Sequence, residues 1–135
     1  SNSTVPHLTV IVGASYGAGN YGMSGRAFGP RFTFTWPTAK IAVMGPKQMA
    51  GVMTIVQRTA TERRGEVFDE EANAKRVASV EHWAEERSKG LFATSRVADD
   101  GMIDPRDTRT VLGIALSACH SNTVAGTKEY GTWRM

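Results

Sequence analysis

The chain has 135 residues, a mass of 14.6 kDa and a formal net charge of +3 at neutral pH. That length suits one domain and is enough to bury a single hydrophobic core. No apolar run reaches the roughly 20 residues that a transmembrane helix requires, so we expect no association with a membrane.

Acidic residues and cysteine are used unevenly. Residues 1–61 contain five bases and no Asp or Glu, whereas residues 62–135 hold all 13 acids. A basic, glycine-rich first half suits an anionic ligand, but its bases are too spread out for a nucleic-acid-binding stripe. The chain has one cysteine, Cys119, and residues 1–7 do not resemble a signal peptide. These two features predict a cytoplasmic location.

The first half of the chain shows the signals of three strands. Leu8–Val12 is a continuous aliphatic run, typical of a buried strand. Asn20–Ala27 predicts a short helix. Arg31–Trp36, which alternates aromatic with polar residues, predicts the second strand. Lys40–Met44 predicts the third, after which Pro46 suits the first turn of a helix.

Two amphipathic helices are predicted next. The helix after Pro46 carries an apolar stripe made by Met49, Val52, Met53 and Val56. Asp69 is expected to cap a second helix that runs to about Lys89. The expected inner side of that helix consists of Val77, Val80, Trp83 and Ala84. Most methionines of this region suit core packing, namely Met23, Met44, Met49 and Met53.

The end of the chain predicts one more helix. Residues 91–105 favour a strand-and-turn segment, and Asp104 is expected to cap the last helix with Pro105 in its first turn. One side of this helix is apolar and consists of Val111, Leu112, Ala115, Leu116 and Cys119. Residues 121–135 show little regular pattern. Strands therefore alternate with helices early and helices dominate later, which indicates an α/β fold.

The segment SYGAGNYGM contains the pattern G-x-G-x-x-G at Gly17, Gly19 and Gly22. A dinucleotide-binding loop also requires an acid about 20 residues later, and the first acid after Gly22 is Glu62. No Gly-Lys-Ser/Thr follows, so the segment is not a phosphate-binding P-loop. A nucleotide-binding module is therefore kept only as an alternative.

Backbone chemistry offers another explanation of this segment. With small residues at Gly17, Ala18 and Gly19, two consecutive amide groups can point outward at the start of a short helix. Such a pair suits an oxygen that gains negative charge during a reaction, an arrangement called an oxyanion hole. The residues alone also fit a glycine-rich turn with a purely structural role.

Other reactive side chains favour structural roles. Cys119 lies on the apolar side of the last predicted helix with no base nearby, which favours packing over nucleophilic catalysis. The three histidines lack metal-ligand spacing, so we expect no metal site from His7, His82 and His120. Acidic residues near the last helix suit turns and caps, namely Asp99, Asp100, Asp104 and Asp107.

Residues around the glycine segment leave two possibilities open. Arg26 and Arg31 flank it and suit either a ligand or subunit contact or an ordinary surface role. Phe34 and Trp36 suit burial in the core better than the lining of a ligand pocket.

Three segments together resemble a known family. SYGAGNYGM with its flanks, DDGMIDPRDTR and the terminal YGTWRM are similar to the carboxyltransferase (β) subunits of biotin-dependent acyl-CoA carboxylases, in particular the methylcrotonyl-CoA carboxylase type. The resemblance covers essentially residues 1–135 and implies the C-terminal part of a longer subunit with two crotonase-like domains. It therefore implies a partial crotonase-like α/β fold.

The resemblance also implies a chemistry. Such subunits transfer CO₂ from carboxybiotin, carried on a separate domain, to the enolate of an acyl-CoA substrate. Matching the motif implies that the amides of Ala18 and Gly19 form the oxyanion hole for the biotin ureido oxygen, with Tyr16 and Gly17 shaping the loop. The acyl-CoA side of the site would lie outside this chain, so we expect no turnover from these residues alone.

Partners and substrate follow from the same resemblance. It implies a biotin carboxylase and biotin carrier subunit as partners, and a homo-oligomer of the full-length subunit. Propionyl-CoA-type subunits typically read AYGGAYDVM where this chain reads SYGAGNYGM. This difference favours a branched or unsaturated acyl-CoA. A non-catalytic assembly fragment is the remaining alternative.

Overall fold

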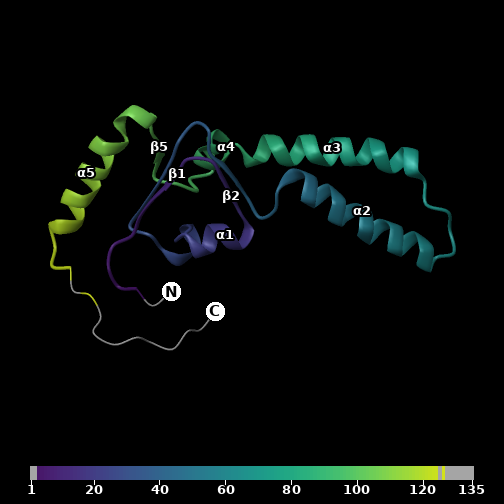
Figure 1. The fold of residues 1–135 in the computed structure, drawn as a ribbon, viewed down its shortest axis with the longest axis horizontal. Helices are drawn as coiled ribbons and strands as arrows, with labels where there is room; N and C mark the ends of the chain where they lie inside the picture. The colour runs from purple at the N-terminus through teal and green to yellow at the C-terminus, as the bar shows by residue number, and fades with distance from the viewer. Residues whose placement is uncertain (1–2, 125, 127–135) are drawn as a thin grey trace.

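The computed structural model describes residues 3–124 and 126. Small parallel sheets at the centre of the molecule are flanked by helices, and a pair of long helices extends to one side (Figure 1). In chain order the elements are β1 (Leu8–Ile11), β2 (Ala14–Tyr16), α1 (Gly17–Gly22), the 3₁₀ turn η1 (Arg26–Phe28), β3 (Phe32–Thr35), β4 (Lys40–Ala42), α2 (Pro46–Arg63), α3 (Glu70–Ser88), α4 (Gly90–Ser95), β5 (Gly101–Met102), the 3₁₀ turn η2 (Pro105–Asp107) and α5 (Thr108–His120). The fold is α/β, as the sequence predicts.

All strand pairs described in the structure are parallel. One sheet has the order β1-β3-β5, and a second sheet pairs β2 with β4. Parallel neighbours cannot be joined by a tight hairpin, so the chain crosses over through helical segments between paired strands. Ile11 and Phe34, from adjacent strands of the first sheet, are buried at its centre.

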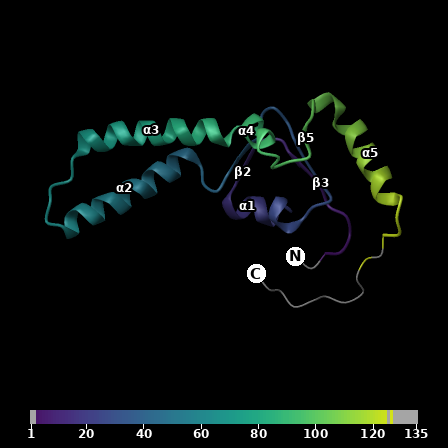
Figure 2. The ribbon, with the colours of Figure 1, turned by 180° about the vertical axis from the view of Figure 1, so that it is seen from behind.

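The two long helices form an antiparallel hairpin that projects away from the sheets, as seen from both sides in Figures 1 and 2. Their predicted starts are confirmed. Pro46 occupies the first turn of α2, and the Asp69 side chain accepts a hydrogen bond from the Ala72 amide at 2.9 Å. The cap leaves fewer unpaired amides at the start of α3 and so fixes where this helix begins.

The apolar stripe of α2 faces outward. Val52, Ile55 and Val56 are 47%, 65% and 63% exposed, whereas the side towards α3 contains buried Ala50 and Thr61. Polar contacts hold the hairpin together, including Thr54 to Asn73 at 3.2 Å and Arg58 to Glu70 at 2.8 Å. Burial in the core is therefore wrong for Met53 and Met23, and Trp83 is half exposed rather than on the inner side of α3.

Three local predictions differ from the structure. The first helix begins at Gly17, not Asn20, and residues 26–28 form a separate 3₁₀ turn. Residues 91–105 form α4 and only a two-residue strand, because Gly90–Ser95 packs as a helix against β4 and α3. The short strand β2 had no sequence signal, since only three residues pair.

A buried carboxylate joins three elements behind the first sheet. Asp99 is 4% exposed, and its Oδ2 accepts hydrogen bonds from the hydroxyls of Thr35, on β3, and Thr94, on α4, at 2.6 and 2.7 Å. The neighbouring Asp100 accepts from the Thr33 amide at 2.7 Å and pairs with Arg26 at 2.8 Å. The predicted turn role of these acids is thus confirmed, and they hold β5 against β3.

Replacing Asp99 with Ala is expected to lower the free energy of unfolding by about 2–4 kcal/mol, because the buried Thr35 hydroxyl and the part-buried Thr94 hydroxyl lose their shared acceptor. Asp107→Ala, at an exposed position, should cost less than about 1 kcal/mol. Urea denaturation of both variants measures the difference. Equal losses would show that the Asp99 network contributes nothing specific.

Candidate functional site

The glycine segment lies where a strand becomes a helix. Tyr16 ends β2 in an extended conformation, and α1 begins at the next residue, Gly17, whose φ is +53°. The first amide groups of a helix have no partner within it, and within the described part of the chain the Tyr16 side chain makes no capping hydrogen bond to them. Ala18 and Gly19 are exposed, while Tyr16 and Gly17 are half-buried.

Gly17 is required by its surroundings. A Cβ at this position would lie 3.0 Å from the Val43 carbonyl oxygen, closer than side-chain carbons normally approach. The positive φ is also one that residues with a side chain rarely adopt. Gly19 differs, because a Cβ there would meet nothing within 4 Å. The turn is therefore tight on its inner side and open above Ala18–Gly19.

A second helix begins beside the first. Because β2 pairs with β4 in parallel, the carboxyl ends of both strands meet, and the loop Val43–Gly45 leads from β4 into α2. Neither helix has an acidic residue in its first turn, and in the described residues no side chain caps either start. Two positive helix ends at one sheet edge favour an anionic group there.

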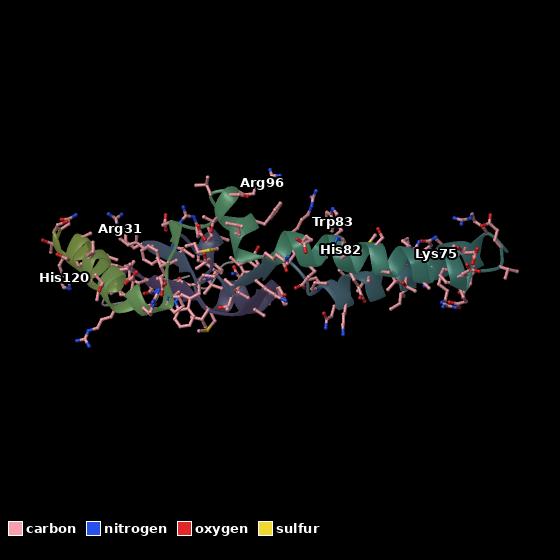
Figure 3. The ribbon with its side chains drawn as sticks, turned by 90° about the horizontal axis from the view of Figure 1, so that it is seen from above. Arg31, Lys75, His82, Trp83, Arg96 and His120 are labelled. Atoms are coloured by element: carbon pink, nitrogen blue, oxygen red, sulfur yellow. The ribbon has the colours of Figure 1, made fainter. Side chains whose placement is uncertain are left out.

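A groove of about 550 Å³ adjoins this edge. It is lined by Tyr16, Gly45, Pro46, Lys47, Gln48, Ala78, Glu81, His82 and Glu85. Its floor is therefore the start of α2 and its wall is α3, on which Figure 3 labels His82. The groove continues the surface of the glycine turn because Tyr16 belongs to both.

An ion pair sets the charge of the groove wall. Lys40, on β4, donates a hydrogen bond to Glu85, on α3. This hydrogen bond, together with the negative charge of Glu85, raises the pKa of the Lys40 ammonium above its usual 10.5. Because the two groups form an ion pair, Lys40 offsets the charge of Glu85 beside the two helix ends.

The structure brings together the residues singled out in SYGAGNYGM, but not the other candidates. Cys119 is buried on α5 and Phe34 is buried on β3, as predicted. Trp36 is half-buried, and its indole Nε1 donates a hydrogen bond to the Thr108 hydroxyl at 3.0 Å. Arg26 forms an ion pair with Asp100. Among residues 3–124 and 126 no cluster of three or more metal-ligating side chains occurs.

Sequence reasoning missed the contribution of α2. The signal for it was the sequence Gly45-Pro46 followed by a helix without early acids. Its position beside Gly17 depends on the β2–β4 register, which three-residue strands do not reveal in a sequence. Asp104 does cap as predicted, accepting from the Arg106 amide at 2.9 Å, although the turn that it begins is 3₁₀.

Comparison with known proteins identifies the class. Residues 1–131 match the carboxyl transferase domain family. The β subunit of geranyl-CoA carboxylase from P. aeruginosa superimposes with a TM-score of 0.76 at 37% identity, over 96% of this chain and 24% of that one. The transcarboxylase 12S subunit, whose structure shows a hexamer, superimposes with a TM-score of 0.72 at 27% identity. The match covers 96% of this chain and 23% of that one.

Curated relatives agree with these structures. A probable biotin-dependent acyl-coenzyme A carboxylase beta2 subunit of Mycobacterium tuberculosis is 55% identical over all of this chain and 26% of that protein. A probable methylcrotonoyl-CoA carboxylase beta chain of Drosophila melanogaster is 44% identical over 98% of this chain and 23% of that protein. The chain belongs to the carboxyl transferase domain family, has its crotonase-like fold in part, and spans about a quarter of the length of these relatives.

One further finding concerns membranes. Within the described residues, no helix combines the length and the apolar character that crossing a bilayer requires.

Replacing Gly17 with Ala is expected to lower the free energy of unfolding by about 1–2 kcal/mol, because the new side chain must adopt a positive φ against Val43. Gly19→Ala is the matched control, since it enters open space within a helix and should lose no stability. Thermal or urea unfolding distinguishes the two. A Gly17→Ala variant as stable as Gly19→Ala would contradict the described turn.

Proposed function

We propose that this chain supplies the biotin side of the active site in the carboxyltransferase half-reaction of an acyl-CoA carboxylase. The observation that carries the proposal is the pair of uncapped helix starts at the β2–β4 edge, with the residues Ala18 and Gly19 exposed. Membership of the carboxyl transferase domain family and relatives named as biotin-dependent carboxylases support it.

The residues present fit such a role. A Cβ on Gly19 would meet nothing within 4 Å, so a ring oxygen has room to approach this part of the turn. Carboxybiotin, when bound, would supply the carboxyl group that is transferred. The amides of Ala18 and Gly19 would hold its ureido oxygen by hydrogen bonds, and the positive end of α2 would favour negative charge at the same place. Tyr16 and Gly17 hold the turn in position.

The remainder of the active site lies outside this chain. Relatives are about four times as long, and we infer that residues 1–135 correspond to the C-terminal part of such a subunit. Binding of the acyl-CoA and stabilisation of its enolate then belong to the other part, and the isolated chain does not turn over. The relatives named for methylcrotonoyl-CoA and geranyl-CoA support a branched or unsaturated substrate.

Assembly follows from the same proposal. The full-length subunit forms a homo-oligomer and works with a biotin carboxylase and biotin carrier subunit in the cytoplasm. The hexamer of the transcarboxylase 12S relative supports the first part of this proposal. The outward apolar side of α2, formed by Val52, Ile55 and Val56, also supports it, because exposed apolar surface of this kind marks protein contacts.

Gly19→Pro in the complete subunit removes one amide donor and is expected to lower kcat by about 10²- to 10³-fold. Proline is acceptable in the first turn of a helix because no intrahelical bond is lost. Gly19→Ala keeps the amide and should retain kcat within about threefold. Steady-state carboxylation of methylcrotonyl-CoA measures both variants. Equal rates in the two would remove Gly19 from the oxyanion hole.

A further inference from the structure

Two arginines and two aromatic residues form a continuous row on α3 and α4. The Arg87 guanidinium lies 4.5 Å from the ring centre of Trp83 and 5.8 Å from that of Phe92. Arg96, at the end of α4, lies 5.3 Å from the ring centre of Phe92. Figure 3 shows Trp83 and Arg96 projecting from the same side of the molecule. We call these four residues the arginine–aromatic row.

The row lies apart from the candidate active site. On α3, Trp83 and Arg87 lie one turn apart on one face. Among the groove residues on α3, Glu81 and Glu85 precede Trp83 and Arg87 by two positions, about 200° around the helix, whereas His82 directly precedes Trp83 and lies about 100° away. Neither arginine of the row lines the groove.

Both arginines of the row have free hydrogen-bonding edges. An arginine stacked on an aromatic ring uses the face of its guanidinium, so that its N–H groups still point outward. Within the described ranges, neither Arg87 nor Arg96 forms an ion pair, and the nearest acids in sequence are engaged elsewhere. Glu86 binds Lys89 at 2.6 Å, whereas Asp99 and Asp100 bind threonines of β3 and α4.

Exposed apolar surface accompanies these cations. Trp83 is 49% exposed, and Leu91, which begins the first turn of α4 beside Phe92, is 71% exposed. Trp, Phe and Arg are the residue types that protein–protein interfaces favour, and Trp and Arg dominate their binding energy. Stacking also fixes the two guanidiniums before binding, so that less side-chain entropy is lost when a partner docks.

We propose that the arginine–aromatic row is a docking surface for an acidic segment of another protein. Carboxylates of that segment accept bidentate hydrogen bonds from Arg87 and Arg96, while its apolar side chains cover Trp83 and Leu91. Charge complementarity selects an acidic partner, because neither cation of the row has an ion-pair partner in the part of the chain that the structure describes. The exposed apolar side chains on the same helices, Trp83 and Leu91, favour a protein segment over a lipid surface or an isolated phosphate.

The test titrates the complete subunit that contains this chain into a fluorescein-labelled twelve-residue peptide of repeated Glu-Glu-Leu and follows anisotropy. The double variant Arg87→Gln/Arg96→Gln should bind at least about tenfold more weakly than the unchanged chain. The matched control is Arg63→Gln/Arg109→Gln, which removes the same charge at two exposed positions outside the row. It should bind within about twofold of the unchanged chain, and far-ultraviolet circular dichroism verifies that both variants are folded.

Three other results would overturn the proposal. Equal weakening in both double variants would mean that net charge alone attracts the peptide. Unchanged binding of a Gln-Gln-Leu peptide would show that carboxylates are not recognised. Binding to phosphatidylserine vesicles that is tighter than peptide binding and equally lost in Arg87→Gln/Arg96→Gln would assign the row to a lipid surface. Trp83→Leu adds a positive check, since loss of the stacking platform should weaken peptide binding several-fold.

Discussion

The parallel pairing of β2 with β4 is the constraint on which the candidate site depends. Only three residues of each strand pair, but they place the ends of both strands side by side. The chain then has to leave each strand through a tight turn, and each turn leads directly into a helix. The approach of Gly17 to the Val43 carbonyl is the result of this pairing. A one-residue change of register would separate the two helix starts and remove their shared positive end.

Charge is distributed to suit that geometry. The chain carries no acid before Glu62, so the first turns of α1 and α2 contain no carboxylate that would neutralise the helix ends. Most acids lie later in the chain, including Glu85 on α3, which pairs with Lys40 on β4. Polar contacts likewise hold α3 to α2, which leaves the apolar side of α2 facing outward. The uneven distribution of charged residues thus leaves positive helix ends at the β2–β4 edge. It also gives the α2–α3 hairpin a polar contact surface and an apolar outer side.

The sequence predicted the elements whose signals are local. The aliphatic run at Leu8–Val12 and the cap at Asp69 correspond to β1 and the start of α3, because burial and capping act within a few residues. The family resemblance located the glycine turn, Tyr16–Gly19, which the structure keeps together. The features that the sequence did not predict depend on contacts between residues far apart in the chain. The helix Gly90–Ser95 forms where α3 and β4 meet it, and the groove exists because α3 returns alongside the start of α2.

The buried carboxylate of Asp99 has a consequence for the order of folding. It bonds to Thr35 across 64 positions of the chain, and the segment between them contains the whole α2–α3 hairpin. Closing so long a loop is entropically costly, whereas the contacts between α2 and α3 are comparatively local. We therefore expect the hairpin to form early and β5 to join the first sheet late. The slowest step in refolding would then be the burial of the Asp99 side chain between two threonines.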